Sequence, residues 1–243
     1  MPRIVADERL DHLAQGDPAA RRSRRDLVRI HCAMRTRSIV SRGWRGLLST
    51  ESTRVPLRIL EIGAGDGSLL LGVARSLAPQ WPAVQLTLLD RQDIVSPTTL
   101  AGYGELGWSA QVQVADVLTW AARPDNEAPG KSLPWDLITT TLFLHHFEGG
   151  QLDLILAAVA SRTDRFFACE PKRSWLPLAG SHLVGAIGAN AVTREDAVLS
   201  VHAGFRDNEI TAAWSRAGDA WHTREFAAGI FSHCFSARRT GIA

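Results

Sequence analysis

The sequence predicts an α/β fold built on a doubly wound, mostly parallel sheet, and three observations lead to this prediction. Short apolar runs of strand length recur from residue 57 onward. Stretches with apolar residues at helical spacing separate several of these runs. A loop with glycines at alternate positions follows the first run and leads into a helix. Such alternation is typical of a parallel sheet that carries helices on both faces.

The individual elements follow from the same patterns. Apolar and β-branched runs predict strands, in chain order, at 58–62, 84–90, 112–118, 135–144 and 165–171. Apolar residues at helical spacing predict helices from Ser68 to before Pro79 and over 151–161. The segment 125–134 is rich in charge, glycine and proline, and it is predicted as a surface loop.

The two ends of the chain add further elements. Residues 1–50 look helical, with a start at Asp17-Pro18, so we divide the chain into an N-terminal helical cap, 1–50, and a sheet domain, 51–243. The apolar stretch 176–192 is broken by proline and glycine, which predicts an irregular active-site cover. A helix is expected over 207–216. Two strand-like runs around Gly229 close the chain.

Composition excludes several classes of protein. The chain has 243 residues, 45% of them hydrophobic, which suits one α/β domain with an added segment. No apolar run approaches the roughly 18 residues of a membrane span, and the first twelve residues lack a secretory apolar core. The separated Cys32, Cys169 and Cys234 read as small buried hydrophobes, so neither disulfides nor a metal site is expected. We therefore expect a cytoplasmic protein with no membrane partner.

Arginine dominates the positive charge of the chain. The formal net charge is only +2, but arginines are dense near the N-terminus, above all in the run 21–25. A solvated helix face explains this run better than a nucleic-acid patch, because no RNA- or DNA-binding module accompanies it. We expect no nucleic-acid partner, and a homodimer stays open.

The glycine loop points to a cofactor. Glu61, Gly63, Gly65 and Gly67 give the pattern E-x-G-x-G-x-G, whereas the dinucleotide fingerprint G-x-G-x-x-G requires glycine at position 68, which is serine. A structural turn or another nucleotide site also produces such loops. The pattern resembles motif I of class I methyltransferases that use S-adenosylmethionine (SAM). This resemblance implies a Rossmann-like, seven-stranded sheet that ends in an antiparallel hairpin, with SAM as cofactor.

Carboxylates at the ends of predicted strands are candidate SAM contacts, because ligands of open α/β sheets bind there. Asp90 closes the second strand and is expected to bind the ribose hydroxyls, with a turn or helix cap as the alternative. By the resemblance, Asp116 faces the adenine amino group and Val117 donates its backbone N–H. Glu61 is expected to orient the loop and meet the ammonium group of SAM, or to bond only to backbone.

Candidate catalytic and acceptor-binding residues follow the later strands. Methyl transfer requires a nucleophile freed of its proton, and a histidine with a pKa near 6.5 can accept it. His145 and His146 end the fourth strand, with a slight preference for His146 as the base, and Glu170 is expected to orient a histidine or bind substrate. Acceptor contacts are expected from a set spread over the chain: Met34, Arg173, His202 and Arg206. Trp44 and Ile30 are expected to wall the same pocket, and the alternative is that the N-terminal helices only dimerise the protein or complete its core. Thr193 and Asp196 fit a capping box at a helix start.

Longer phrases extend the resemblance over nearly the whole chain. DLVRIH (26–31), LFLHHFE (142–148), ACEPKRS (168–174) and VTREDAVLSVHAGFR (192–206) resemble bacterial small-molecule methyltransferases associated with type III polyketide synthase clusters. The resemblance implies methyl transfer to a phenolic or quinol-like hydroxyl. Two alternatives stay open: C-methylation of an electron-rich ring, and a SAM-binding partner protein without catalysis.

Overall fold

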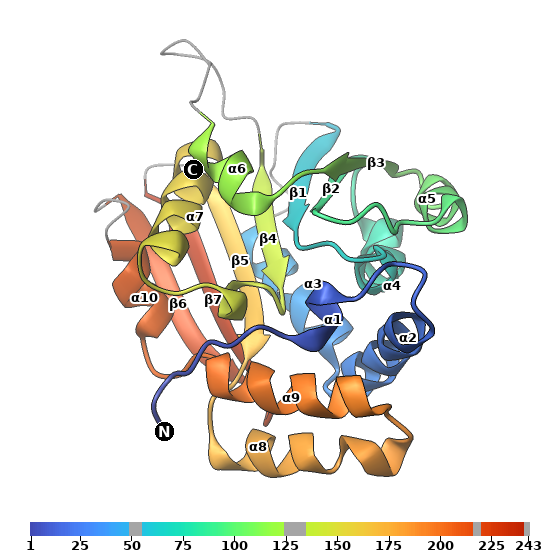
Figure 1. Ribbon diagram of the computed structural model, residues 1–243. Coiled ribbons are helices and arrows are strands. Elements are labelled where there is room, and N and C mark those ends of the chain that lie inside the picture. The colour runs from blue at the N-terminus through green and yellow to red at the C-terminus, as the bar shows by residue number, and fades with distance from the viewer. Residues whose placement is uncertain (49–54, 124–134, 216–219, 241–243) are drawn as a thin grey trace.

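Seven strands form one twisted sheet with helices on both faces (Figure 1). The computed structural model describes residues 1–48, 55–123, 135–215 and 220–240. The strands are β1 (Leu57–Ile62), β2 (Val84–Asp90), β3 (Ser109–Val114), β4 (Leu137–Thr141), β5 (Arg165–Pro171), β6 (Trp221–Ala228) and β7 (Ser232–Arg239). All five strands predicted from the sequence are present, and the two closing runs form β6 and β7.

The order of the strands is β3-β2-β1-β4-β5-β7-β6. The first five strands pair in parallel, and β7 pairs antiparallel with both β5 and β6. The predicted mostly parallel sheet with a terminal antiparallel hairpin is therefore confirmed. Because the chain winds outward from β1 in one direction and from β4 in the other, the switch point lies between these two strands.

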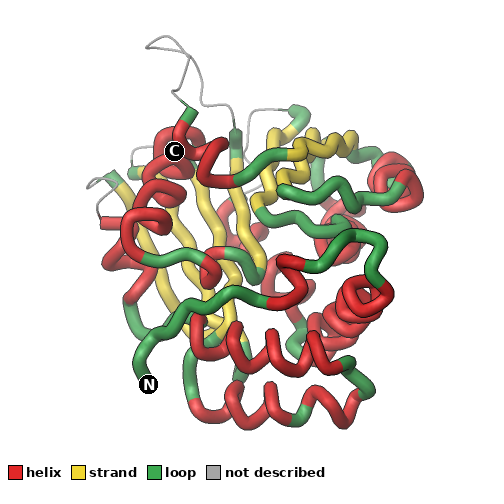
Figure 2. The backbone as a smooth tube through the Cα atoms, viewed as in Figure 1, coloured by secondary structure: helices red, strands yellow, loops and turns green. Residues whose placement is uncertain are grey.

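Two layers of helices cover the sheet (Figures 1 and 2). The helices are α1 (Arg9–His12), α2 (Pro18–Ala33), α3 (Thr36–Leu47), α4 (Ser68–Leu77), α5 (Pro97–Gly104), α6 (Val117–Ala122), α7 (Gly149–Arg162), α8 (Trp175–His182), α9 (Ala191–Ala203) and α10 (Glu209–Trp214). Short 3₁₀ turns add η1 (Ala78–Gln80), η2 (Leu144–His146) and η3 (Val184–Ile187). Helices α3 and α4 pack on one face of the sheet, and α6, α7 and α10 on the other.

The core divides between the two faces because side chains alternate along each strand. Ile59 of β1 joins the cluster under α3 and α4, whereas its neighbour Leu60 joins the cluster under α6 and α7. Both residues are fully buried. A strand that is covered on both faces needs apolar residues at consecutive positions, which explains the continuous apolar runs in the sequence.

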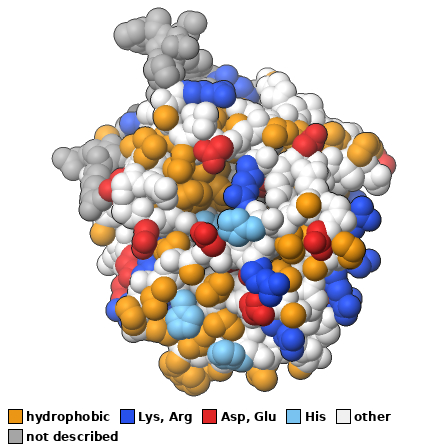
Figure 3. Space-filling view, in the orientation of Figure 1, with side chains coloured by type: hydrophobic (Ala, Val, Ile, Leu, Met, Phe, Trp, Pro, Cys, Tyr) orange, Lys and Arg blue, Asp and Glu red, His pale blue; other side chains and the backbone are white. Residues whose placement is uncertain are grey.

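The N-terminal helices differ in their surroundings. Trp44 of α3 is fully buried, its indole Nε1 donates to Thr139 Oγ1 at 3.3 Å, and its ring stacks on Trp81. Of the two alternatives for Trp44, the wall of the acceptor pocket is therefore wrong and a place in the core is correct. Helix α2 is amphipathic, and its exposed arginines lie on the face seen at the right in Figure 3. The division at residue 50 stays a prediction, because residues 49–54 lie outside the described part of the chain.

Several sequence boundaries need correction. Strand β3 ends at Val114 and not at 118, because Asp116 caps the N-terminus of α6 with its side chain. The stretch 176–192 is less irregular than predicted: Pro177 lies in the first turn of α8, where a missing N–H costs no hydrogen bond. Asn190, and not Thr193, caps α9. The loop predicted at 125–134 lies outside the described residues.

Two further properties concern cysteines and membranes. Cys32 is exposed, contrary to the expectation of burial, whereas Cys169 and Cys234 are buried and stand opposite each other in the β5–β7 ladder. In the part of the chain that the structure describes, no helix combines the length and apolarity needed to cross a bilayer.

Candidate active site

A cavity of about 370 Å³ lies at the carboxyl ends of β1, β2 and β4, next to the switch point of the sheet. Its lining comes from the glycine loop after β1, the ends of β2 and β5, the start of α6, the loop after β4, helix α2 and helix α9. The N-terminal residues Glu8, Leu10 and Asp11 also line it. Segments that are distant in sequence thus meet where open α/β sheets bind their ligands.

The glycine loop turns sharply against this cavity. Gly63 and Gly65 line the cavity with positive φ angles of 75° and 56°. A Cβ atom at Gly63 would lie 2.2 Å from the Phe143 ring, so only glycine fits there. Gly67 does not line the cavity. It caps α4 with a φ of 71°, and its carbonyl accepts a hydrogen bond from the Tyr103 hydroxyl. The first two glycines therefore face the cavity, and the third turns the chain into the helix.

Asp90 ties two loops together at the end of β2. Its Oδ2 accepts a hydrogen bond from the Gly65 backbone N–H at 2.8 Å, and its Oδ1 accepts one from the Gln92 N–H at 2.9 Å. The turn-forming role that the sequence offered as an alternative is thus present. Since Asp90 also lines the cavity and each carboxylate oxygen has two lone pairs, hydrogen bonding to a ligand remains open to it.

Glu61 is a buried carboxyl with spare bonding capacity. Its side chain is almost fully buried, and no hydrogen bond from the described residues reaches its Oε2. Burial raises the pKa of Glu61 well above its usual range, and the nearby Asp90 and Asp66 raise it further. A buried carboxyl without a partner costs stability unless a ligand satisfies it. The site therefore suits a ligand with a cationic donor group, such as the ammonium of SAM.

Asp116 and Val117 lie side by side at the start of α6, and both line the cavity. The Asp116 Oδ1 accepts a hydrogen bond from the Thr119 N–H at 2.9 Å, so this oxygen caps the helix. The roles predicted for both residues toward adenine stay predictions.

The two histidines lie in the η2 turn, and both line the cavity. Strand β4 ends at Thr141 and not at 144 as predicted, so the histidines follow the strand and are not part of it. Their ring centroids are 4.2 Å apart. His145 is buried, and its Nδ1 lies 2.9 Å from Glu170 Oε2. Glu170 is fully buried and also accepts hydrogen bonds from the Phe143 and Leu144 backbone N–H groups. Glu170 therefore orients a histidine and fixes the turn that carries it, which is one of the two roles expected for it.

The histidines differ in charge. Burial alone lowers the pKa of His145, but hydrogen bonds to Glu170 and Glu8 outweigh it and raise this pKa to about 9. Burial and the neighbouring positive charge of His145 lower the pKa of His146. At neutral pH, His145 is therefore an imidazolium whose nitrogens both face carboxylates. His146 is neutral and faces the cavity.

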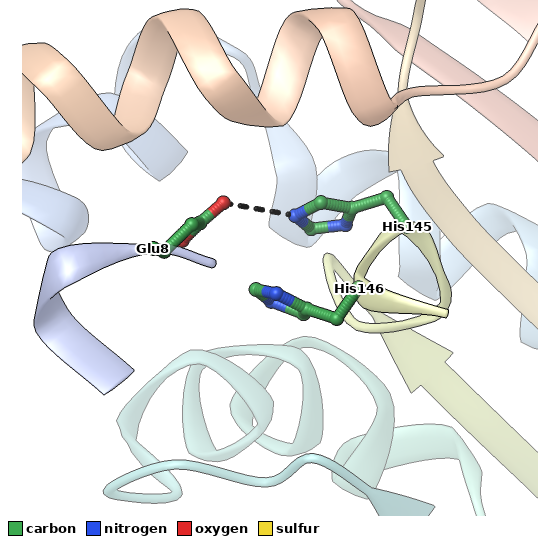
Figure 4. A group of neighbouring side chains, drawn as sticks. All are labelled: Glu8, His145 and His146. Atoms are coloured by element: carbon green, nitrogen blue, oxygen red, sulfur yellow. Dashed lines mark hydrogen bonds and ion pairs between the residues drawn. The ribbon is translucent and has the colours of Figure 1, made fainter. Parts of the chain in front are cut away.

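Glu8 is a site residue that the sequence did not point to. Residues 1–12, here called the N-terminal strap, bring Glu8 within 3.4 Å of His145 Nε2, as Figure 4 shows. The polar atoms of Glu8, His145 and His146 lie within 4.8 Å of one another, which is the spacing of groups that bind metals. Because carboxylates already occupy both nitrogens of His145, we interpret the group as an ion cluster. No local motif marks Glu8, since only the fold brings it to residue 145.

The predicted acceptor residues divide into two groups. Met34 lines the cavity, together with Ile30 and His31 of α2. Arg173, His202 and Arg206 are not among the lining residues. Arg173 is buried, donates to the Gly204 carbonyl and pairs with Glu209. The carbonyl of His202 accepts a hydrogen bond from the Ile4 N–H, and Arg206 pairs with Asp207 at the surface.

Two solved structures of methyltransferases have folds similar to that of this chain. The chain is similar to the plantazolicin methyltransferase BpumL in complex with SAH and a pentazolic desmethylPZN analog, with 14% identity, a TM-score of 0.61 and 92% of each chain covered. It is similar to the mitomycin 7-O-methyltransferase MmcR at 17% identity and a TM-score of 0.56, over 95% of this chain and 60% of that one. No protein-family model and no curated protein matches the sequence. At these identities the likeness establishes a shared fold.

Proposed function

We propose that this protein is a SAM-dependent methyltransferase that methylates a hydroxyl of a small aromatic, polyketide-like metabolite. One observation carries the proposal: a single cavity joins Glu61, whose Oε2 has no hydrogen-bond partner among the described residues, and the glycine loop to a neutral histidine, His146. The first two features suit the amino-acid portion of SAM, and the third suits an acceptor that must lose a proton. The methyltransferase fold of the similar structures supports the same function.

The residues of the chain then have distinct tasks. Glu61 receives the ammonium group, the backbone of Gly63 and Gly65 surrounds the amino-acid portion, and Asp90 receives the ribose hydroxyls. When bound, SAM supplies a methyl group on a positively charged sulfur. The task of the chain's own residues would then be alignment, because the acceptor hydroxyl would have to be held close to the methyl group of the bound cofactor.

His146 is the proposed proton acceptor. Since its pKa is lowered, its ring is unprotonated at neutral pH and accepts the hydroxyl proton as the new oxygen–carbon bond forms. Leu27 and Ile30 of α2, together with Met34 at its C-terminal cap, offer the apolar wall against which an aromatic ring packs.

The test uses mass spectrometry of reactions with SAM and a panel of phenols and quinols. The wild-type protein is expected to add one methyl group to a hydroxyl. His146→Ala is expected to lower kcat by about 10²–10⁴-fold, with the affinity for SAH unchanged by calorimetry. His222→Ala is the matched control, because that histidine is exposed on β6.

Three results would contradict parts of the proposal. A near-normal rate of His146→Ala removes His146 as the base. A methyl group on ring carbon identifies a C-methyltransferase. Tight SAH binding without turnover of any acceptor indicates a SAM-binding partner protein.

A further inference from the structure

The N-terminal strap is held by partners that are distant in sequence. The Ile4 N–H donates to the His202 carbonyl at 3.1 Å. The backbone N–H groups of Arg9 and Leu10 donate to the two oxygens of Asp196, at 2.8 and 3.0 Å. Figure 1 shows the strap running along α9 toward α2. These bonds hold Glu8 and Asp11 over the cavity.

The strap also contacts the turn that carries the histidines. Arg3 donates through Nη2 to the Phe147 carbonyl at 2.9 Å and to the His145 carbonyl at 3.3 Å. Its guanidinium lies 4.3 Å from the centroid of the Phe205 ring, in a cation–π contact. The strap and the η2 turn therefore form one packed unit in this closed arrangement.

Glu8 is the strap residue whose side chain contacts the ring of His145. Its side chain is only 13% exposed, accepts a hydrogen bond from Ser200 Oγ and lies 3.4 Å from His145 Nε2. On the opposite side of the same ring, Glu170 Oε2 lies 2.9 Å from Nδ1. Two carboxylates from distant parts of the sequence thus lie on opposite sides of one imidazole ring.

We propose that Glu8 is a positioning residue that fastens the N-terminal strap over the active site, through a Glu8–His145–Glu170 clamp. A protonated imidazole donates from both nitrogens and satisfies both carboxylates at once. A neutral ring donates from only one nitrogen, so one buried carboxylate would then face a lone pair. The clamp is therefore closed while His145 carries its proton.

The clamp acts on His146, whose ring centroid lies 4.2 Å from that of His145 at an interplanar angle of 32°. The charged and titratable groups that face this pair are Glu8 and Asp11 from the strap and Glu170 from β5. Asp11 Oδ2 lies 3.7 Å from His146 Nδ1, and Asp11 Oδ1 lies 3.2 Å from Arg91 Nη2, next to Asp90. When the strap is held by the clamp, Asp11 lies between Arg91, which neighbours Asp90, and the proposed base His146.

The direct test is a titration of His145 by NMR in protein with labelled histidine. Its pKa of about 9 in the wild type rests on both carboxylates. Glu8→Gln keeps the size of the side chain and removes the charge, so we expect the pKa to fall by about one unit or more. Asp7→Asn is the matched control, since Asp7 is the neighbouring, exposed carboxylate, and it is expected to leave this pKa unchanged.

A second measurement follows strap closure. Amide hydrogen exchange of Ile4, Arg9 and Leu10 in Glu8→Gln is expected to be about tenfold faster or more at neutral pH, since local opening sets the protection. In the wild type the same amides are expected to lose protection as the pH rises through about 9, because His145 then loses its proton. In Asp7→Asn the protection is expected to match the wild type.

The kinetic readout rests on the proposed function, whereas the two measurements above do not. With an acceptor that the wild type methylates, kcat is measured as a function of pH. The fall of kcat at high pH is expected to move to lower pH in Glu8→Gln, at unchanged SAH affinity. If Glu8→Gln is folded and both the His145 pKa and the strap protection equal those of the wild type, the proposal is overturned. Absence of SAH binding in the wild type would instead overturn the proposed function. The clamp would then still be tested by the NMR titration of His145 and by the amide hydrogen exchange of the strap.

Discussion

Replacement of Glu61 by Gln is expected to stabilise the unliganded protein and to weaken cofactor binding. The stability effect follows from the raised pKa of this buried carboxyl. From about pH 4.5 upward, the folded protein retains a proton on Glu61 that the unfolded chain has lost, so the free energy of unfolding falls as the pH rises. Each unit of raised pKa corresponds to about 1.4 kcal/mol. Gln keeps the shape of the side chain and removes this cost.

The binding effect has the opposite sign. In the proposed complex, the carboxylate oxygen that lacks a partner receives the ammonium group of the ligand. Loss of a hydrogen bond to a charged group costs about 1.5–3 kcal/mol, or roughly a 10- to 150-fold rise in Kd. SAH is a suitable probe because it keeps the amino-acid portion of SAM.

Two measurements at pH 7 check this prediction. Differential scanning calorimetry without ligand is expected to give a higher Tm for Glu61→Gln, by about 2–4 °C for each kcal/mol, and titration calorimetry is expected to give the weaker Kd for SAH. Glu105→Gln, which changes an exposed carboxylate outside the cavity, is expected to alter neither quantity. A lower Tm together with unchanged SAH binding would refute the reasoning, because Glu61 would then be a structural residue with partners of its own.

Three further predictions separate ligand contacts from core packing. Asp90→Ala removes the acceptor for the Gly65 and Gln92 N–H groups as well as the proposed ribose contact, so SAH binding is expected to weaken by about 1.5–3 kcal/mol. As a ligand control, NAD is expected to leave the Tm of the wild type unchanged. A Tm shift by NAD but not by SAM would contradict SAM as the cofactor. Met34→Ala is expected to raise the acceptor KM with SAH affinity intact, because Met34 lines the cavity. Trp44→Ala is expected instead to lower the free energy of unfolding by about 3–5 kcal/mol, because Trp44 is fully buried. If Trp44→Ala changed the acceptor KM and left the free energy of unfolding unchanged, its place in the core would be contradicted.

The sequence by itself determined the α/β class, the order of the elements and the glycine loop. These features are local: an apolar run covered on both faces, a helical period and a chain reversal each depend on residues within one segment. Because the carboxyl ends of parallel strands share one edge of the sheet, the sequence also predicted that Glu61, Asp90, Asp116 and the histidine pair meet there. All of them line the cavity.

Only the tertiary structure decided how the two histidines differ and which N-terminal residues belong to the site. The pKa of His145 depends on Glu170, 25 positions away, and on Glu8, 137 positions away. Likewise, no local pattern separates Met34, which lines the cavity, from Trp44, which lies in the core. Burial and pairing of charges are set by contacts between distant segments, and adjacent residues of the same type therefore receive different protonation states from the fold.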